Sequence, residues 1–348
     1  MVRGLSAEPL TPTRRRPMKI RQLDGTGDAA YPAWFAARDA GYAHDFPGGP
    51  RWLEHELQVY YERSDAFDVA LWLAEDDGAV VGAAAVAMPL KDNPTLGEVD
   101  IAVRPEARRR GVGTALLRTV EDEAVLRGRT RFMVDVEGPL GPHDSAGTRF
   151  AEKHGYTRRI VEVLRVQRPP FDLDGLARLE READAHAADY RVLTWRDRVP
   201  DEYVAEYARM TARLSTDAPL GQLDYEQETW DAGRIRLRED RLARMRRHVW
   251  CAVAVAPDGT IAGQTAIVLA AGDDSTGLQE ETIVDPRHRG HRLGLLLKIA
   301  NLRTLLRDRP GVRTIWTWNA DTNTYMIAVN EKLGYVPAGW LVGYQRDV

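Results

Sequence analysis

The residues whose types and spacing most clearly suggest chemistry lie in one turn. Three arginines, Arg108, Arg109 and Arg110, follow an apolar segment and immediately precede Gly111 and Gly113. An amphipathic segment comes next, which predicts a helix whose first amides face outward. The glycines place no side chain in front of those N–H groups, and the helix dipole adds positive potential. The turn therefore predicts a site for a polyphosphate, with the arginines as further hydrogen-bond donors.

A second copy of this turn lies late in the chain. Pro105 and Gly113 recur as Pro286 and Gly294, at one offset of 181 residues. A later motif, Glu-Lys-x-Gly-Tyr, also occurs twice, at nearly the same spacing. Two motifs that recur in the same order at a domain-sized period indicate a tandem duplication.

The pattern Arg/Gln-x-x-Gly-x-Gly/Ala, followed by a helix, a strand and the Glu-Lys-x-Gly-Tyr motif, resembles the GNAT superfamily of acyl-CoA-dependent N-acetyltransferases. The tandem layout is similar to that of its mycothiol synthase-like group. The second copy departs from the pattern, because Arg292 stands where the first glycine is usual. The resemblance implies an α+β fold with two tandem GNAT-like domains, each a mixed central β-sheet flanked by helices. It also implies acetyl-CoA, or another acyl-CoA, as co-substrate, with its pyrophosphate on the turn and its pantetheine between two splayed strands.

The chain divides into four parts in this interpretation. Apolar alternation predicts strands just before each turn, at 97–103 and 280–284, and a helix over 109–127. The parts are a disordered tail at 1–17, a first domain at 18–168, a linker helix within 169–189, and a second domain at 190–348.

The residues expected to contact acetyl-CoA lie in the two turns and beyond a later strand of the second half. Asparagine amides match the donors and acceptors of pantetheine, although Asn323 also fits a helix cap. The set comprises Val103, Arg108, Arg109, Arg110, Gly111, Val112, Gly113, Thr114, Val284, Arg289, Gly290, Arg292, Gly294, Asn319 and Asn323.

Acyl transfer to an amine needs a base for the amine, a donor for the developing oxyanion and a proton for the leaving thiolate. The resemblance implies that the base is a carboxylate from the strand before the turn. The candidates are Asp100, with Glu98 beside it, in the first half, and Glu280 or Glu281 in the second. Successive strand residues face opposite ways, so only one of Glu280 and Glu281 can point into a given site. An ion pair with a neighbouring arginine is the structural alternative for each.

The position of the usual thiolate-protonating tyrosine holds Ala151 in the first half and Asn330 in the second. Neither side chain has a usable proton near neutral pH, which leaves Tyr325 or water as the acid. The second half nevertheless carries the denser set of polar residues. We therefore expect one half to be catalytic and the other structural.

Composition narrows the remaining possibilities. The chain has 48 Lys+Arg and 52 Asp+Glu, a formal net charge of −4, which does not favour nucleic acid as a partner. Cys251, the one cysteine, lies in an apolar segment that predicts a buried strand, consistent with a reducing cytoplasm. No apolar run approaches the roughly 20 residues of a membrane span. His288 and His291 lack partners at metal-ligand spacing, so no metal is expected.

The sequence thus predicts an N-acyltransferase that moves an acetyl or other acyl group from acyl-CoA to a primary amine, most simply of a small molecule. The protein is expected to act as a monomer or homodimer. Two alternatives stay open: an acyltransferase that takes its acyl group from acyl carrier protein, and a non-catalytic acyl-CoA-binding sensor.

Overall fold

The computed structural model describes residues 18–217 and 221–348, so the predicted tail at 1–17 lies outside the described residues. The strands are β1 (Lys19–Gln22), β2 (Phe67–Asp76), β3 (Ala79–Pro89), β4 (Leu96–Val103), β5 (Arg131–Pro139), β6 (Thr157–Gln167), β7 (Arg191–Arg196), β8 (Arg247–Val255), β9 (Ile261–Ala270), β10 (Thr276–Val284), β11 (Thr314–Ala320) and β12 (Val336–Asp347). The helices are α1 (Tyr31–Asp45), α2 (Glu54–Tyr60), α3 (Val112–Leu126), α4 (Ala146–Lys153), α5 (Leu173–Asp184), α6 (Val204–Ala212), α7 (Leu214–Asp217), α8 (Ala232–Arg244), α9 (Leu293–Asp308) and α10 (Thr324–Lys332).

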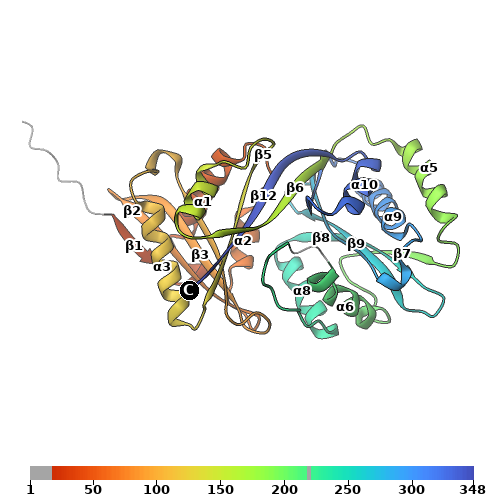
Figure 1. The fold of residues 1–348 in the computed structure, drawn as a ribbon, viewed down its shortest axis with the longest axis horizontal. Helices are drawn as coiled ribbons and strands as arrows, with labels where there is room; N and C mark the ends of the chain where they lie inside the picture. Colours follow the sequence, from red (N-terminus) through yellow and green to blue (C-terminus); the bar gives the residue numbers. More distant parts are fainter. Residues whose placement is uncertain (1–17, 218–220) are drawn as a thin grey trace, which may run out of the picture.

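One sheet runs through both halves of the molecule (Figure 1). Across the described residues its strand order is β1-β2-β3-β4-β5-β12-β6-β11-β10-β9-β8-β7. The pairs β4–β5 and β10–β11 are parallel, and the other pairs are antiparallel. The predicted α+β fold with mixed sheets is confirmed.

Each half places its helices on the sheet in the same way. In β2, Leu71 and Leu73 pack against α1 and α2, whereas the alternate residue Trp72 packs against α3 on the other face. In the second half, α6 and α8 take the place of α1 and α2 and cover Cys251 and its neighbours. Helices α9, α10 and α5 take the place of α3 and α4.

The two halves exchange their last strands. Strand β6 comes at the end of the first half in sequence, but it pairs with β11 of the second half. Strand β12, last in the chain, pairs with β5 of the first half, and β6 and β12 pair with each other at the centre. The two therefore run side by side through the middle of the molecule (Figure 1). The domain limits drawn from the sequence stay a prediction, but the part of the sheet in each half is completed by a strand from the other half.

The parallel pairs separate soon after they begin. Strands β4 and β5 pair over Leu96–Glu98 and Arg131–Met133, and then part towards the first turn. Strands β10 and β11 pair from Thr276 to Leu278 and part in the same way. Each half therefore has an opening between two strands that leads from the arginine-glycine turn to the point where the strands meet.

Candidate active site

The two turns share one backbone conformation although their glycines stand at different positions. In the first turn Arg109 and Gly111 have positive φ values of 63° and 86°, and in the second Gly290 and Arg292 have values of 91° and 55°. Arg292 therefore keeps the left-handed conformation of the glycine that it replaces. An arginine in this region costs about 1–2 kcal/mol relative to the right-handed form. The departure from the family pattern leaves the shape of the turn intact.

The helices that leave these turns have uncapped first amides. Neither α3 nor α9 receives a side-chain hydrogen bond at its N-cap, Gly111 or Arg292. In contrast, Asp231 caps α8 and Asn323 caps α10. The helix dipole and the unused N–H groups together make both turns suitable for an anion.

The first arginine of each turn braces the backbone. In the first half, Arg108 Nη1 lies 2.6 Å from Asp45 Oδ1, and its Nε donates to the Val103 carbonyl at 3.0 Å. In the second half, Arg289 Nε donates to the Val284 carbonyl at 3.4 Å. These arginines fix the end of the strand to the turn.

The other arginines of the turns lie nearer to solvent. Arg110 forms an ion pair with Asp76, whereas Arg109 is exposed. The side chain of Arg292 is 44% exposed, and its Nη1 lies 3.9 Å from Glu182 at the end of α5. Arg109 and Arg292 are therefore placed to reach an anion that binds the helix amides.

The space above the two turns differs. A methyl group added at Gly113 would lie 3.2 Å from the ring of Phe150 on α4. At Gly294 the nearest atom to such a group is Thr282 Cγ2, at 3.8 Å. The space above the first turn is thus narrowed by the ring of Phe150, and the space above the second turn is more open at the same point.

Two of the four predicted candidates for the base are held by arginines. Asp100 accepts hydrogen bonds from Arg38 Nε at 2.6 Å, Tyr61 Oη at 2.8 Å and Tyr42 Oη at 3.0 Å. Glu281, at the corresponding place in the second half, lies 3.3 Å from Arg238 Nη1. Both carboxylates thus form an ion pair with an arginine, which is the structural alternative to a role as base.

Glu280 differs because it forms no ion pair with any described residue, although a β-bulge contains both it and Glu281. Gln279 pairs with Ile267 and Thr282 pairs with Thr265, so Glu280 and Glu281 together oppose a single residue of β9. The side chain of Gln279 fills the gap in the ladder, since its Nε2 donates to the Ala266 carbonyl at 2.7 Å. A bulge leaves one residue without a ladder partner, which frees backbone donors where β10 and β11 part.

The carboxylate of Glu280 makes no hydrogen bond or ion pair with any described residue. Burial raises the pKa of Glu280 to about 7, and the charge of Glu281 adds to the rise. A carboxylate with a pKa near the working pH is suited to accept a proton.

The first half also has a carboxylate without a hydrogen bond or ion pair among the described residues, Glu98, which lies two residues before Asp100 on β4. Burial raises its pKa to about 7, and the nearby charges of Asp135 and Glu228 raise it further. Glu228 belongs to residues 221–231, here called the crossing segment, which passes from the second half over the first. In this segment Glu226 N donates to Asn93 Oδ1 at 2.7 Å. The crossing segment thus covers the first half on the side of the sheet where β4 and β5 meet.

The predicted pantetheine contacts of the second half form a small polar group. Asn330 is fully buried, and its Nδ2 donates to Asn319 Oδ1 at 2.6 Å. Its own Oδ1 has no partner among the described residues. Asn323 caps α10 by accepting from Met326 N at 3.2 Å, which is the structural role foreseen for it. Tyr325 is 60% exposed at the start of α10.

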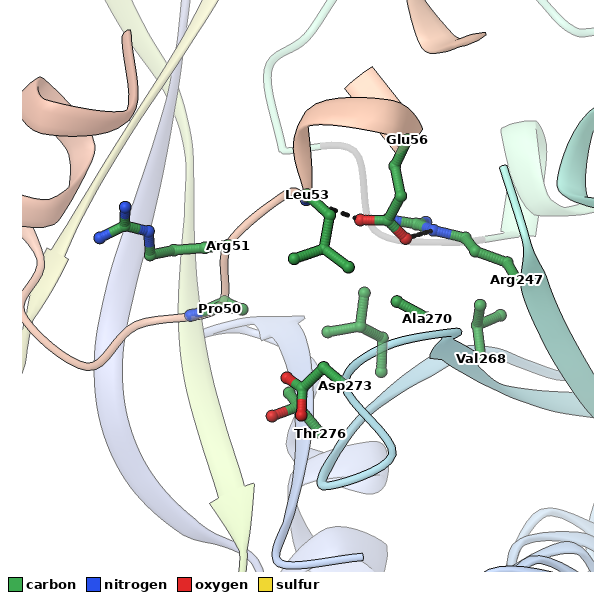
Figure 2. Close-up of a pocket in the computed structure, with 10 residues that line it drawn as sticks. Pro50, Arg51, Leu53, Glu56, Arg247, Val268, Ala270, Asp273 and Thr276 are labelled. Carbon is green, nitrogen blue, oxygen red and sulfur yellow. Dashed lines mark hydrogen bonds and ion pairs between the residues drawn. The ribbon is translucent and has the colours of Figure 1, made fainter. Parts of the chain in front are cut away.

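A small cavity lies between the halves, beside the start of β10 (Figure 2). The first half contributes Leu53 and Glu56, and the second contributes Arg247, Val268 and Leu278. Leu278 is the last residue of β10 that pairs with β11. The cavity therefore lies at the end of the second opening that is remote from the turn.

Sequence reasoning missed the ion pair at the top of this cavity. Arg247 Nε lies 2.7 Å from Glu56 Oε1, and the two side chains are 9% and 1% exposed. The residues stand 191 positions apart, so no local pattern connects them. Arg38 and Arg238, which hold the strand carboxylates, were missed for the same reason.

The remaining expectations concern metals, membranes and the cysteine. Within residues 18–217 and 221–348, no group of three or more His, Cys, Asp or Glu side chains is arranged to hold a metal ion. His288 instead contacts Tyr190 Oη at 3.0 Å, and His291 contacts the His186 carbonyl at 3.0 Å. None of the described helices combines the length and apolarity needed to cross a membrane. Cys251 is buried, as predicted.

Residues 33–156 and 214–335 each match the Acetyltransferase (GNAT) family, and the chain belongs to this family. It is a tandem GNAT protein and an acyl-CoA-dependent acetyltransferase, as the repeated motifs predicted.

Among its relatives is the mycothiol acetyltransferase of Geodermatophilus obscurus, 27% identical over 94% of this chain and 97% of that protein. The mycothiol acetyltransferase of Salinispora arenicola is 28% identical over 72% of this chain and 73% of its own length. A solved tandem GNAT protein from the clavulanic acid biosynthesis pathway is 28% identical, with a TM-score of 0.76 over 95% of this chain and 98% of its own. A GCN5-related N-acetyltransferase from Sphaerobacter thermophilus shares the fold, with a TM-score of 0.63 at 18% identity over 95% of both chains.

Proposed function

We propose that the second half transfers an acetyl group from acetyl-CoA to the primary amine of a small molecule, with Glu280 as the base. The observation that carries the proposal is the free carboxylate of Glu280 at the point where β10 and β11 part. The relatives named mycothiol acetyltransferase support a small-molecule acceptor.

The second turn fits the phosphate end of acetyl-CoA. The uncapped amides at the start of α9 face the turn, and Arg292 stands beside them. The open space above Gly294 leaves room for a chain that runs towards the bulge. There the partnerless Oδ1 of Asn330 offers an acceptor for a pantetheine amide. Bound acetyl-CoA supplies the activated thioester.

Glu280 takes one proton from the acceptor ammonium, which leaves a neutral amine beside the thioester carbonyl. The amine nitrogen forms a bond to the carbonyl carbon as the carbon–sulfur bond breaks, and backbone donors freed by the bulge stabilise the developing oxyanion. The second amine proton leaves with the thiolate to give the thiol. Glu280 returns its proton to solvent, so each turnover releases one proton.

The first half is proposed to bind acetyl-CoA without catalysing transfer. Its turn has the same conformation and the same uncapped helix. However, Asp100 is occupied by three donors, and Glu228 of the crossing segment lies near Glu98. Phe150 also narrows its groove beside Gly113.

Thiol release from acetyl-CoA, measured with a panel of small primary amines, tests the proposal. Amine-dependent release that is lost in Glu280→Gln supports it. Thiol release from acetylated acyl carrier protein, but not from acetyl-CoA, identifies acyl carrier protein as the donor. Binding of acetyl-CoA without turnover of any amine identifies a sensor.

A further inference from the structure

Arg247 is a buried cation whose hydrogen-bonding capacity is only partly used. Its side chain is 9% exposed, and its Nε donates to Glu56 Oε1 at 2.7 Å. One face of the guanidinium is covered by Trp52, whose ring centroid lies 4.2 Å from Cζ. Among the described residues, none accepts a hydrogen bond from Nη1 or Nη2. Arg247 is one of the residues that line the cavity between the halves (Figure 2).

The other charged groups of this wall are already satisfied. The second oxygen of Glu56 accepts from Leu53 N at 2.8 Å. Asp273 accepts from Ser275 N at 3.1 Å, within its own turn. Arg51 forms an ion pair with Asp39, and its side chain points away from the cavity (Figure 2). Nη1 and Nη2 of Arg247 are therefore the charged donors of this wall that have no acceptor among the described residues. Such unpaired donors are unusual in a side chain this deeply buried.

The cavity lies near the proposed reaction site. Leu278 lines it and lies two residues before Glu280 on β10. The positive charge of Arg247 acts on Glu280 and opposes the rise in pKa that burial causes there. A molecule that reaches Glu280 with its amine can thus extend its other end towards Arg247.

We propose that Arg247 binds a carboxylate of the acceptor through Nη1 and Nη2, so that the acceptor is an amine that carries a carboxylate, such as an amino acid. This inference rests on the proposed function of the second half. A guanidinium fork matches a carboxylate in two parallel hydrogen bonds. A doubly charged phosphate fits less well, because Glu56 and Asp273 stand in the same wall.

The test compares matched acceptors, each an amino acid and the amine that remains without its carboxylate: β-alanine with ethylamine, and γ-aminobutyrate with propylamine. We expect kcat/KM to favour the amino acid by at least tenfold, mainly through KM. Arg247→Gln leaves Glu56 without its cation, so the double variant Glu56→Gln/Arg247→Gln is made as well. Circular dichroism and a melting curve show whether each variant is folded. In a folded variant, the ratio of kcat/KM for the amino acid to kcat/KM for the matched amine should fall to near one. Arg51→Gln is the control from the same wall and should keep the preference.

Equal kcat/KM for amino acids and amines in the parent, or a preference that survives in the folded double variant, would overturn the inference. Calorimetric titration with β-alanine keeps the two proposals separate. If no amine is acetylated but β-alanine binds the parent and not the double variant, the carboxylate site stands while the proposed reaction fails. If amines are acetylated in a Glu280-dependent manner without regard to the carboxylate, the reaction stands and the assignment of Arg247 fails.

Discussion

Arg238 Nη1 lies 3.3 Å from Glu281 Oε1, and this ion pair decides which of two adjacent carboxylates is free. The first half has the same arrangement, with Arg38 holding Asp100 at 2.6 Å. In both halves a helix on the same face of the sheet supplies the arginine. Both halves therefore have an ion pair at this position of the strand, although the arginines come from different helices, and the free carboxylate of the second half is the preceding residue, Glu280.

Glu280→Gln should lower kcat/KM by about 10²–10⁴-fold, because glutamine cannot accept the ammonium proton. The parent should show an acidic limb with an apparent pKa near 7, since Glu280 titrates at about 7 and acts only when ionised. The variant should lose this limb. The measurement is kcat/KM against pH with one accepting amine.

Glu281→Gln is the matched control for that experiment. It leaves Arg238 without its counter-ion, so it should lower the free energy of unfolding, by less than the roughly 3–5 kcal/mol of a fully buried pair, because Arg238 is 31% exposed. The acidic limb should persist in the folded variant. A flat pH profile in Glu281→Gln with a normal one in Glu280→Gln would assign the base to Glu281 instead.

Arg292→Gly should weaken coenzyme A binding to the second turn by tenfold or more, the effect of losing one charge-assisted contact of about 1.5–3 kcal/mol. Its stability should change little. Glycine relieves the left-handed backbone at φ 55° but is more flexible in the unfolded chain. Calorimetry with coenzyme A gives the affinity, and Arg109→Gly is the counterpart in the first turn. Tighter binding by Arg292→Gly would show that the arginine obstructs the site.

Lys298→Leu should stabilise the protein at neutral and acidic pH. Lys298 is 2% exposed, lies over the ring of Tyr335 at 5.5 Å, and has no ion pair among the described residues. Burial lowers its pKa to about 7, whereas the unfolded chain keeps the ordinary value of about 10.4. The unfolded state therefore binds more protons between these values, and the parent gains stability as the pH rises from about 7 to about 10.

The leucine variant removes that dependence, and its advantage should shrink towards pH 10. We expect a gain of about 1–3 kcal/mol at pH 6, measured by denaturant unfolding across the pH range. The first half already has Leu117 at the corresponding position, 2% exposed in its core. A constant difference between parent and variant from pH 6 to pH 10 would mean that Lys298 stays charged in the folded state.

Removal of β12 by truncation after Tyr335 should unfold the first half more than the second. The first half would lose the strand that pairs with β5 over Gly339–Asp347 and the core residues Trp340, Val342 and Tyr344. The second half would keep β6 beside β11. Hydrogen exchange of the amides in β3 and in β9 distinguishes the halves. Equal protection in both would show that the exchange of strands contributes little to stability.

Local features of the fold could be predicted from the sequence, and the relations between distant residues could not. The turns, the helices that follow them and the burial of Cys251 depend on short patterns, and all were predicted. For the second half, the sequence could narrow the predicted base only to Glu280 or Glu281. Choosing between them by alternation along the strand assumes a regular ladder, which the bulge beside Gln279 breaks. The partners of Asp100 and Arg247 come from other elements, so no local sequence pattern indicates them. The exchange of β6 and β12 also escapes sequence reasoning, since each half contains a suitable closing strand of its own.

The position of β12 has a consequence for how the protein is made. The strand follows all the others in the chain, so the ribosome delivers it last, after the whole second half has emerged. Until then β5 presents an unpaired edge, which is the kind of surface on which nascent chains pair wrongly or aggregate. The first half therefore cannot mature during its own synthesis. The exchange of β6 and β12 thus makes completion of the sheet in the first half depend on synthesis of the second half.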